Sequence, residues 1–357
     1  MKSRALPALE VVDRAVMTLH EIDPLRDRRW RDLTQRCERS SLFHTTEWLE
    51  ALRRTYGYQP VAFTNAGPGE PISNALLFCR VNSWLTGKRL VALPFSDHCE
   101  PLVESPSMLA ALLESLKPMV GPRCRYIEVR PLHMPVNVEG FSPSADYIAH
   151  AIDLRPDLGV IEDGLHKNHA RRAIRKALRS GVDVEVGRSR ELLADFYTLH
   201  AMTRRRHSAP IQPYRWFQNL LDCLKDRLTI YMARLGRQPA ATILTARHKT
   251  TLMFKYGCLD PAYNRLGGTP HLFWRAIEDA KQEGLVLFDL GRSDTDNPGL
   301  IAFKDHLGAT RTPLTYYRYP PQQEEQQWLP RLASSVYAKT PSRLQTVLSS
   351  RLYKHFG

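Results

Sequence analysis

The sequence predicts an α/β (α+β) fold with mixed, mostly antiparallel sheets flanked by helices. The chain has 357 residues, of which 43% are apolar, so it is long enough for two domains with sizeable cores. Apolar runs with strand periodicity alternate with amphipathic helical segments in both halves. Strand-like runs at 228–235, 240–247 and 251–259 follow one another across short turns, as in an antiparallel meander.

The composition favours anionic partners and excludes several classes of protein. The chain has 50 lysines and arginines against 37 acidic residues, a net charge of +13. This charge suits nucleotides, phosphorylated substrates, RNA or an anionic membrane, and does not choose among them. The cysteines occur singly, without the spacing of a zinc site, so we expect reduced thiols and no metal. No signal segment or run of roughly 18 apolar residues is evident, so we expect a cytoplasmic protein.

The first half is predicted as helix, strand meander, helix and strands. Residues 1–40 are polar and weakly periodic. The helix expected at 45–56 has a threonine at its start, and Gly57 suits its C-terminal end. The strands are expected at 60–63, 75–81, 89–95, 126–129 and 147–154, and a second helix at 107–116.

A polar cluster follows the third of these strands. Asp97 and His98 are candidates for substrate binding or for a carboxylate–imidazole pair. Their spacing does not match a pair of metal ligands on a helix, and a metal would need ligands from elsewhere. The alternative, which the sequence favours, is a polar turn that only positions a loop.

The most basic stretch, residues 163–181, is predicted as one helix that ends at Gly181. Leu165, Ile174 and Leu178 belong to its expected buried stripe. Its cations recur every four residues, and a solvated face explains them as well as contact with an anion does. A strand at 182–186 and helices at 191–206 and 214–224 are expected next.

A second group of charged residues follows the apolar run 285–290, which is predicted as a buried strand. The run contains Asp289 and ends before Gly291, where the chain must turn, and Arg292 opens the polar loop beyond it. A short helix is then expected to present Lys304. Charged groups at the rim of a buried strand are typical of α/β sites because the sheet holds them rigidly.

Two further segments are interpreted as parts of the same site. Lys255 and Tyr256 lie near the end of the last meander strand, with Tyr256 expected on the face of Leu252 and Lys255 on the other. The lysine needs water, an acid or an anionic ligand, and reaching solvent is the simpler alternative. Residues 265–268 precede a helix expected at 271–283, where glycines let backbone N–H groups converge on a phosphate. Ordinary loops also carry such glycines.

This order of elements resembles the GNAT acyltransferase fold. In that fold a Gln/Arg-x-x-Gly-x-Gly/Ala loop holds the pyrophosphate of coenzyme A. The resemblance implies that Arg265, Gly267 and Gly268 bind the cofactor. Pro270 stands at the final small position and has no N–H to donate.

A closer resemblance is to the FemAB-like family, which has tandem GNAT-type domains. Its members include peptidoglycan interpeptide-bridge aminoacyltransferases, which use aminoacyl-tRNA. They also include bacterial relatives encoded near polysaccharide loci, for which acyl-CoA is the expected donor. The most specific match is the pattern Phe-Asp-Leu-Gly…Phe-Lys…Gly at 288–308. The other similar segments lie at 43–48, 93–98, 171–182, 196–207 and 254–257.

The resemblance implies an N-acyltransferase that acts on an amine of a cell-envelope or polysaccharide precursor. The family lysine near the acceptor and the scissile ester corresponds to Lys304. A phosphate-binding arginine at the end of a helix corresponds to Arg206, with Arg205 left open. The helix hairpin that bridge-forming enzymes use against tRNA is not evident, which favours acyl-CoA over aminoacyl-tRNA as the donor.

Chemical roles are assigned on that basis. Lys304 would stabilise charge, Tyr256 would donate a proton to the leaving group, and Asp289 would orient or receive the ammonium. Arg206, Lys255 and Arg292 would bind phosphate or carboxylate. The sequence singles out no general base. The alternative function is a non-catalytic module that binds RNA or an anionic glycan on a degenerate transferase scaffold.

Four segments are expected: a polar segment at 1–40, a first GNAT-like domain at 41–155, a second at 156–320 that carries the main site, and a tail at 321–357. The tail is predicted to contain an amphipathic helix at 342–354. That helix could lie on the inner face of an anionic membrane. Packing against its own protein or a second subunit is the alternative.

Overall fold

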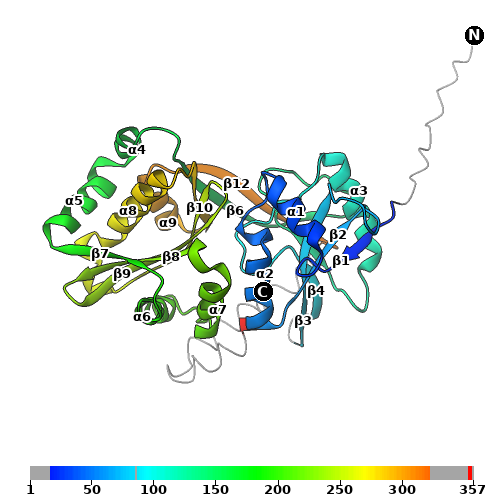
Figure 1. The fold of residues 1–357 in the computed structure, drawn as a ribbon, viewed down its shortest axis with the longest axis horizontal. Coiled ribbons are helices and arrows are strands. Elements are labelled where there is room, and N and C mark those ends of the chain that lie inside the picture. The colour runs from blue at the N-terminus through cyan, green and yellow to red at the C-terminus, as the bar shows by residue number, and fades with distance from the viewer. Residues whose placement is uncertain (1–16, 85–86, 322–352, 356–357) are drawn as a thin grey trace, which may run out of the picture.

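All the described strands lie in one continuous sheet. The computed structural model describes residues 17–84, 87–321 and 353–355. Its 12-stranded sheet has the order β1-β2-β3-β4-β5-β12-β6-β11-β10-β9-β8-β7. The sheet runs through both lobes of an elongated molecule, with β6 and β12 between them (Figure 1). Within the described chain only the pairs β4–β5 and β10–β11 are parallel, so the predicted mixed, mostly antiparallel fold is confirmed.

The first half contributes five strands at one end of the sheet. The expected helix over 45–56 is confirmed as α2, with the Thr45 side chain at its N-terminus and Gly57 in the left-handed conformation at its end. The elements are β1 (His20–Ile22), α1 (Arg28–Arg36), α2 (Thr46–Tyr56), β2 (Gln59–Thr64), β3 (Ala75–Ser83), β4 (Gly87–Val91), α3 (Pro106–Leu116) and β5 (Ile127–Val129).

The second half contains the predicted meander and crossover. Its strands are β6 (Ser142–Asp153), β7 (Val182–Gly187), β8 (Leu228–Leu235), β9 (Gln238–His248), β10 (Thr251–Leu259), β11 (Leu287–Asp294) and β12 (Thr310–Tyr319). Its helices are α4 (Leu158–Gly164), α5 (Arg172–Arg179), α6 (Arg190–Arg206), α7 (Tyr214–Leu224), α8 (Gly268–Gln282) and α9 (Pro298–His306).

The two halves are built alike and exchange one strand each. Each half runs from antiparallel strands to a parallel pair, which is β4–β5 in one and β10–β11 in the other. The strand that follows β5 in the chain is β6, and it pairs with β11. The strand that follows β11 is β12, and it pairs with β5. Because β6 and β12 also pair with each other, the exchange joins the halves into one sheet.

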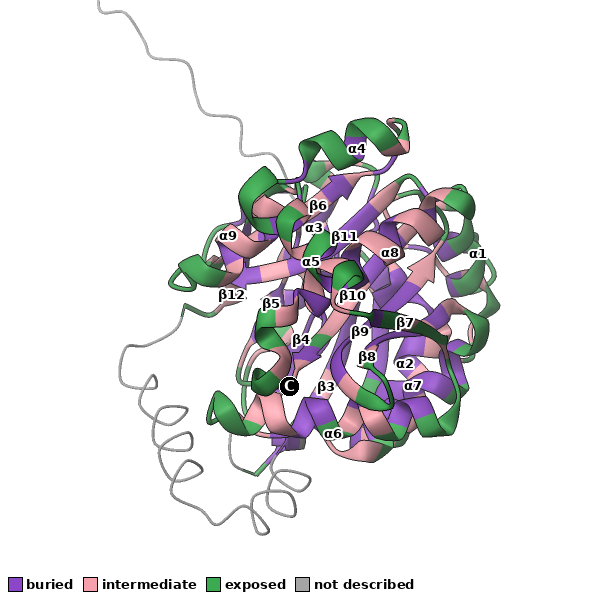
Figure 2. Ribbon diagram, turned by 90° about the vertical axis from the view of Figure 1, so that its left-hand side faces the viewer, coloured by how far each residue is buried: buried purple, intermediate pink, exposed green. Residues whose placement is uncertain are grey.

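Two hydrophobic cores lie on opposite faces of the second half of the sheet. Strand positions such as Leu252 and Phe288 pack with α5 and α8. The intervening position Met253 packs with α6 and α7, in a core that continues into the first half. The strands between these layers are largely buried, while the outer faces of the helices are exposed (Figure 2).

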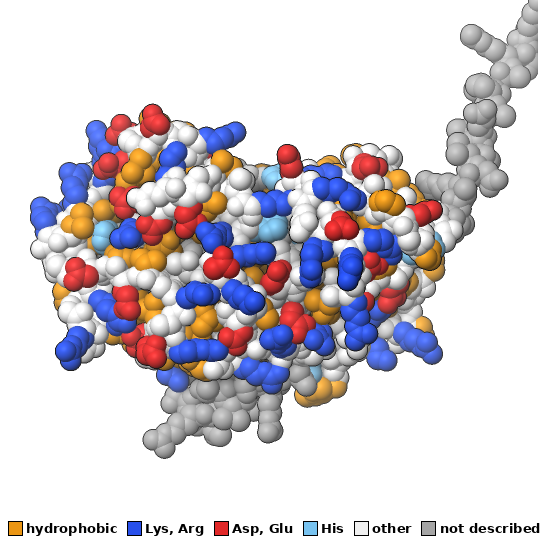
Figure 3. Space-filling view, in the orientation of Figure 1, with side chains coloured by type: hydrophobic (Ala, Val, Ile, Leu, Met, Phe, Trp, Pro, Cys, Tyr) orange, Lys and Arg blue, Asp and Glu red, His pale blue; other side chains and the backbone are white. Residues whose placement is uncertain are grey.

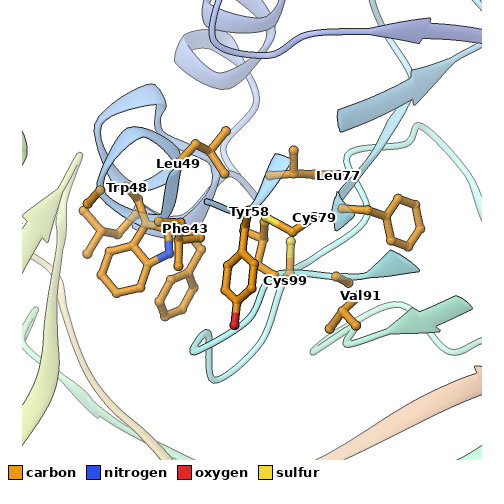
Figure 4. Packing of buried hydrophobic residues seen from close by; sticks show 14 of the residues in the cluster. Phe43, Trp48, Leu49, Tyr58, Leu77, Cys79, Val91 and Cys99 are labelled. Carbon is orange, nitrogen blue, oxygen red and sulfur yellow. The ribbon is translucent and has the colours of Figure 1, made fainter. Parts of the chain in front are cut away.

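Aromatic side chains join the two halves in the shared core. Trp48 of α2 lies edge-on to Phe43 at 5.0 Å and to Trp216 of α7 at 5.4 Å between ring centroids. Figure 4 shows Phe43 and Trp48 beside Tyr58, Leu77 and the thiols of Cys79 and Cys99. The first half is therefore held against α7 by packing as well as by the sheet.

The structure corrects two sequence-based expectations about the elements. The strand expected at 89–95 ends at Val91, because Leu93 and Phe95 adopt positive φ angles of 61° and 63° and turn the chain out of the sheet. The helix expected at 163–181 is broken into α4, a π-helical turn η3 (Lys167–Arg171) and α5. Leu178 is 59% exposed, so its assignment to the buried stripe was wrong.

The surface and the tail bear on the remaining expectations. Cations and carboxylates are interspersed over the face in Figure 3. Among the described residues no helix is both long enough and apolar enough to cross a bilayer. The helix expected at 342–354 lies outside the described residues apart from its last positions. These belong to a short turn, η7 (Tyr353–His355), whose Tyr353 stacks on Tyr56.

Candidate active site

The parallel pair β10–β11 opens at its C-terminal end. The two strands are in register only from Thr251 and Leu287 to Met253 and Asp289, although both continue beyond that point. Past it, each strand carries one extra residue relative to its antiparallel neighbour, β10 between Phe254 and Tyr256 and β11 between Asp289 and Arg292. Such bulges re-aim side chains and end pairing, which creates a gap in the sheet here.

The bulge in β10 corrects the expected direction of Tyr256. Lys255 is the extra residue, so alternation restarts after it, and Tyr256 packs in the Met253 core rather than beside Leu252. The Trp216 indole N–H donates to the Tyr256 hydroxyl at 2.8 Å. Burial raises the pKa of this phenol, so it stays protonated.

A buried ion pair spans the two halves at this gap. The Lys255 ammonium donates to Asp97 at 2.6 Å, with only 6% and 19% of the two side chains exposed. Burial alone would raise the pKa of Asp97, but Lys255, Arg292 and His98 outweigh it and lower the pKa. Gly291 is in the left-handed conformation, and a Cβ there would lie 3.2 Å from an Asp97 oxygen.

Arg292 is held beside this pair by aromatic rings. Its guanidinium lies 3.9 Å from the centroid of the Tyr147 ring and donates to the Tyr316 hydroxyl at 2.8 Å. That hydroxyl donates in turn to the backbone carbonyl of Asp97 at 2.6 Å. Sequence reasoning missed Tyr316 because β12, which carries it, was not predicted.

A second pair, His98 and Asp289, lies at the gap on the face of the sheet that carries Met253. The two side chains are nearly buried, and the His98 Nε2 lies 3.0 Å from the Asp289 carboxylate. The other Asp289 oxygen accepts from the Gly291 N–H at 2.8 Å. Burial opposes the charged imidazole, but the hydrogen bond and charge of Asp289, with Asp97 and Glu100, raise the pKa of His98.

The second nitrogen of His98, Nδ1, is buried and makes no hydrogen bond to the described residues. Since the Nε2–H donates to Asp289, Nδ1 carries the lone pair in the neutral imidazole. A carboxylate that orients one ring nitrogen is one half of a general-base arrangement, which is complete when the other nitrogen reaches the reactant.

Lys304 reaches the same gap from the opposite side. Lys304 is only 2% exposed, and its ammonium donates to the carbonyls of Gly291 and Arg292 at 3.0 and 2.9 Å. Burial lowers the pKa of Lys304 to about 8, against the charges of Asp97 and Asp289, which raise it. An ammonium has three N–H donors, so one remains after these two bonds.

A cavity of about 440 Å³, here called the inner cavity, opens beside the His98–Asp289 pair. It is lined by strand positions that share one face of the sheet, including Met253 and Asp289, and by the loop at 38–42. Glu100 also lines it and was missed as a candidate. One Glu100 oxygen accepts from the N–H groups of Leu132 and His133, while the other is buried without a partner in the described chain.

A second cavity of about 490 Å³, here called the outer cavity, lies on the other face of the sheet. It is bounded by the start of α8, by η3 and α5, and by α9. Arg265, Gly267 and Pro270 line it, together with the cations Arg172 and Lys176. Among the described residues no carboxylate lines it.

The remaining predicted residues are placed differently. Gly268 is buried, and a Cβ there would lie 3.3 and 3.6 Å from the side chains of Ala233 and Ala241, so it allows α8 to approach the sheet. Arg206 is exposed at the end of α6, beside His207, and lines neither cavity. The structure thus brings together Lys304, Asp289, Lys255, Arg292, Asp97 and His98, with Tyr256 in the adjoining core.

Replacing Gly267 by alanine should destabilise the protein more than the same change at Gly181. Both glycines have positive φ angles, 80° and 69°, so both variants carry the left-handed penalty of about 1–2 kcal/mol. At Gly267 the new Cβ would also overlap the Ala173 carbonyl, whereas at Gly181 nothing lies within 4 Å. Urea unfolding measures the difference, and equal losses in the two variants would contradict this packing.

Replacing Asp97 by asparagine should cost about 3–5 kcal/mol of folding free energy, because the buried Lys255 ammonium loses its counter-charge. The double variant Asp97→Asn, Lys255→Met should recover most of that loss. A control is Asp222→Asn, which breaks an exposed pair with Arg190 of the same 2.6 Å length and should cost at most about 1 kcal/mol. Chemical denaturation provides the values, and similar losses in Asp97→Asn and Asp222→Asn would refute the importance of burial.

Comparisons with known proteins show which folds this chain resembles. Residues 165–304 match the family model described as acetyltransferase (GNAT) domain. The FemX crystal structure superposes with a TM-score of 0.66 at 15% identity, covering 89% of this chain and 100% of FemX. A tandem GNAT protein from the clavulanic acid biosynthesis pathway gives 0.53 at 11% identity, covering 86% of this chain and 100% of that one.

A third structure contains a bound coenzyme A thioester. Saccharomyces cerevisiae N-myristoyltransferase, solved with bound myristoyl-CoA, gives a TM-score of 0.50 at 12% identity, covering 90% of this chain and 83% of the yeast chain. No curated protein matches the sequence. The match over residues 165–304 to an acetyltransferase (GNAT) domain supports an acyltransferase, and the chain shares its fold with FemX and with the tandem GNAT protein.

Proposed function

We propose that the protein transfers an acyl group from acyl-CoA to an amine of a cell-envelope or polysaccharide precursor. The observation that carries this proposal is the position of the gap between β10 and β11. A cavity lined by cations lies on one face of the sheet and a cavity beside a histidine–carboxylate pair lies on the other. A donor and an acceptor on opposite faces can meet only through such a gap.

The outer cavity suits the phosphates of coenzyme A. Arg172, Lys176 and Arg265 supply positive charge at its wall. The N-terminus of α8, a helix of 15 residues, adds free backbone N–H groups and the positive end of its dipole. Pro270 removes one of these donors, and the three cations offset that loss. In this proposal residues 156–320 bind the donor, and residues 41–155 supply Asp97 and His98.

The inner cavity would receive the acceptor amine. Asp289 and Glu100 line it with carboxylate oxygens that attract an ammonium, which loses one proton to solvent to become the neutral amine. His98 Nδ1 accepts the second proton as the amine attacks. As the amine nitrogen bonds to the thioester carbon, the third N–H of Lys304 and its charge stabilise the oxyanion. The carbon–sulfur bond then breaks, and the thiolate takes a proton from Tyr256 or from the His98 imidazolium.

The acceptor class rests on the resemblance to the FemAB-like family, whose bridge-forming members modify peptidoglycan precursors. Aminoacyl-tRNA is the alternative donor. The basic surface of η3 and α5, including Lys167, Arg175 and Arg179, is the feature that favours an RNA or an anionic glycan as partner. These exposed cations lie next to the outer cavity, so both donors would approach from the same side.

Titration calorimetry with free CoA and with tRNA tests the donor. CoA is expected to bind, and Arg265→Ala should weaken that binding by about tenfold, the usual effect of one charge-assisted contact. Arg237→Ala removes an exposed arginine at the β8–β9 turn and should leave it unchanged. Salt-sensitive binding of tRNA, with no heat from CoA, would reject the proposal in favour of the RNA alternatives.

A further inference from the structure

Three histidines meet at the rim of the outer cavity. His166 directly precedes η3, His169 lies within it, and His306 ends α9. One ring nitrogen from each can be chosen so that all lie within 4.8 Å of one another. The ring centroids are 4.6 Å apart for His166–His169 and His166–His306, and 4.0 Å apart for His169–His306.

The backbone fixes these positions. The His166 N–H donates to the His306 carbonyl at 3.0 Å, which ties the entry of η3 to the end of α9. The His166 carbonyl accepts from the N–H groups of His169 and Arg171 at 3.3 and 3.2 Å, which closes the π-helical turn. Turns of this kind are rare in proteins, and those that occur often lie at functional sites.

The chemistry of this cluster matches one class of ligand. Among the described residues, this is the one group of three or more histidine, cysteine or acidic side chains whose ligand atoms converge in this way. Three imidazoles without a thiolate or carboxylate suit zinc, copper, nickel and cobalt ions rather than magnesium or calcium. Three protein ligands leave one position open in a tetrahedral site.

We propose that His166, His169 and His306 bind one divalent transition-metal ion of the zinc class at the rim of the outer cavity. Zinc–nitrogen bonds of about 2.0–2.1 Å require ligand atoms closer together than in the present arrangement. The rings of His169 and His306 lie nearly parallel, at 4°, so one of them must turn to place the ion in both ring planes. His169 is exposed and has room to turn.

The orientation of His166 is already defined. Its Nδ1 accepts from the backbone N–H of Asn168 at 3.3 Å, which leaves Nε2 for the ion. The bound ion would clamp η3 to the end of α9, two residues beyond Lys304. Its open position would be available to a water or to an anionic oxygen. An anionic oxygen there would offset the positive charge of the nearby cations. The sequence could not show this site because His306 is remote in the chain from the other two ligands.

Cobalt(II) titration of the full-length chain, with any polyhistidine tag removed, tests the proposal. We expect one ion per chain and the visible absorption bands of tetrahedral cobalt. His169→Gln and His306→Gln should each weaken cobalt binding by roughly 100-fold. Removing a residue that only supports a metal ligand already weakens metal binding by about 10- to 100-fold, and removing a ligand should cost at least as much. His20→Gln, which changes a histidine in β1 far along the chain, should bind as the unaltered protein does.

Thermal unfolding with zinc provides a readout that does not depend on acyl transfer. Zinc should raise the Tm of the unaltered protein and of His20→Gln, and should not raise that of His166→Gln. His166 is exposed, so this variant is expected to fold. The proposal is overturned if cobalt gives no tetrahedral spectrum, or if the ligand variants bind it as tightly as the control. Because metal binding is measured directly, this result is independent of which donor the enzyme uses.

Discussion

Replacing Lys304 by methionine is expected to lower kcat about 100- to 1,000-fold, the usual effect of removing one donor that stabilises an oxyanion. The lysine holds the carbonyls of Gly291 and Arg292 and has one N–H left to face the gap. Methionine has a similar length but neither charge nor donor. Steady-state kinetics with a saturating acyl donor measures the loss, which should appear in kcat rather than in the KM for the donor.

Lys281 provides a matched control for this prediction. Its ammonium also donates to backbone carbonyls, those of Leu154 and Pro156, each at 2.8 Å, but it lies on α8 away from the gap. Lys281→Met should therefore lose stability and keep its kcat. If both lysine variants lose activity equally, Lys304 acts only through the fold.

The dependence of stability on pH gives an independent check on Lys304. Its pKa is about 8 in the folded protein and 10.5 as the ordinary value, so the unfolded chain binds more protons between these two values. Stability should accordingly gain a favourable contribution as pH rises from about 8 to 10.5. Lys304→Met should lack this contribution, as measured by urea unfolding across that range.

Replacing His98 by glutamine is expected to lower kcat about 100- to 10,000-fold, the range for losing a positioned general base. The acidic limb of the pH profile should change with it. The activity of the unaltered enzyme should rise with pH as the His98 imidazolium loses its proton. The midpoint of this rise should lie above pH 6.5, the ordinary pKa of histidine. It should fall again as Lys304 loses its proton near pH 8. The profile is therefore a narrow bell.

Two variants separate His98 from other histidines. Asp289→Asn removes the charge that raises the pKa of His98, so the acidic limb should move to lower pH while the bell persists. His200 is buried, and burial lowers its pKa to about 3, so His200→Gln should leave the acidic limb in place. An acidic limb that persists unchanged in His98→Gln would show that another group is the base.

Much of the second half could be predicted from the sequence because its signals are local. The alternation and turns of β8–β10, the crossover through α8 and the short helix that presents Lys304 all depend on neighbouring residues. The strand β12 was missed because Pro313 interrupts its apolar pattern and its partners, β5 and β6, lie far away in the chain. The exchange of β6 and β12 is likewise set by long-range pairing.

The site was predictable in its charges and not in its geometry. Asp97, Lys255, Asp289 and Lys304 stood out as charged groups near the ends of apolar runs. The bulge at Lys255 leaves no sequence signal, so Tyr256 was expected on the wrong face. His98 was given less weight than a simple turn because its partner, Asp289, lies in the other half of the molecule.

The central claim is that an acyl group passes from a coenzyme A thioester through the gap between β10 and β11 to an amine. Its most direct test is mass spectrometry of a cell extract incubated with the purified protein and isotopically labelled acyl-CoA. The account predicts labelled amides and an equal release of free CoA thiol, both lost with Lys304→Met and retained with Lys281→Met. Thiol release without any labelled amide would contradict it, as would an extract in which labelled acyl-CoA gives no labelled amide but labelled aminoacyl-tRNA, supplied in its place, does.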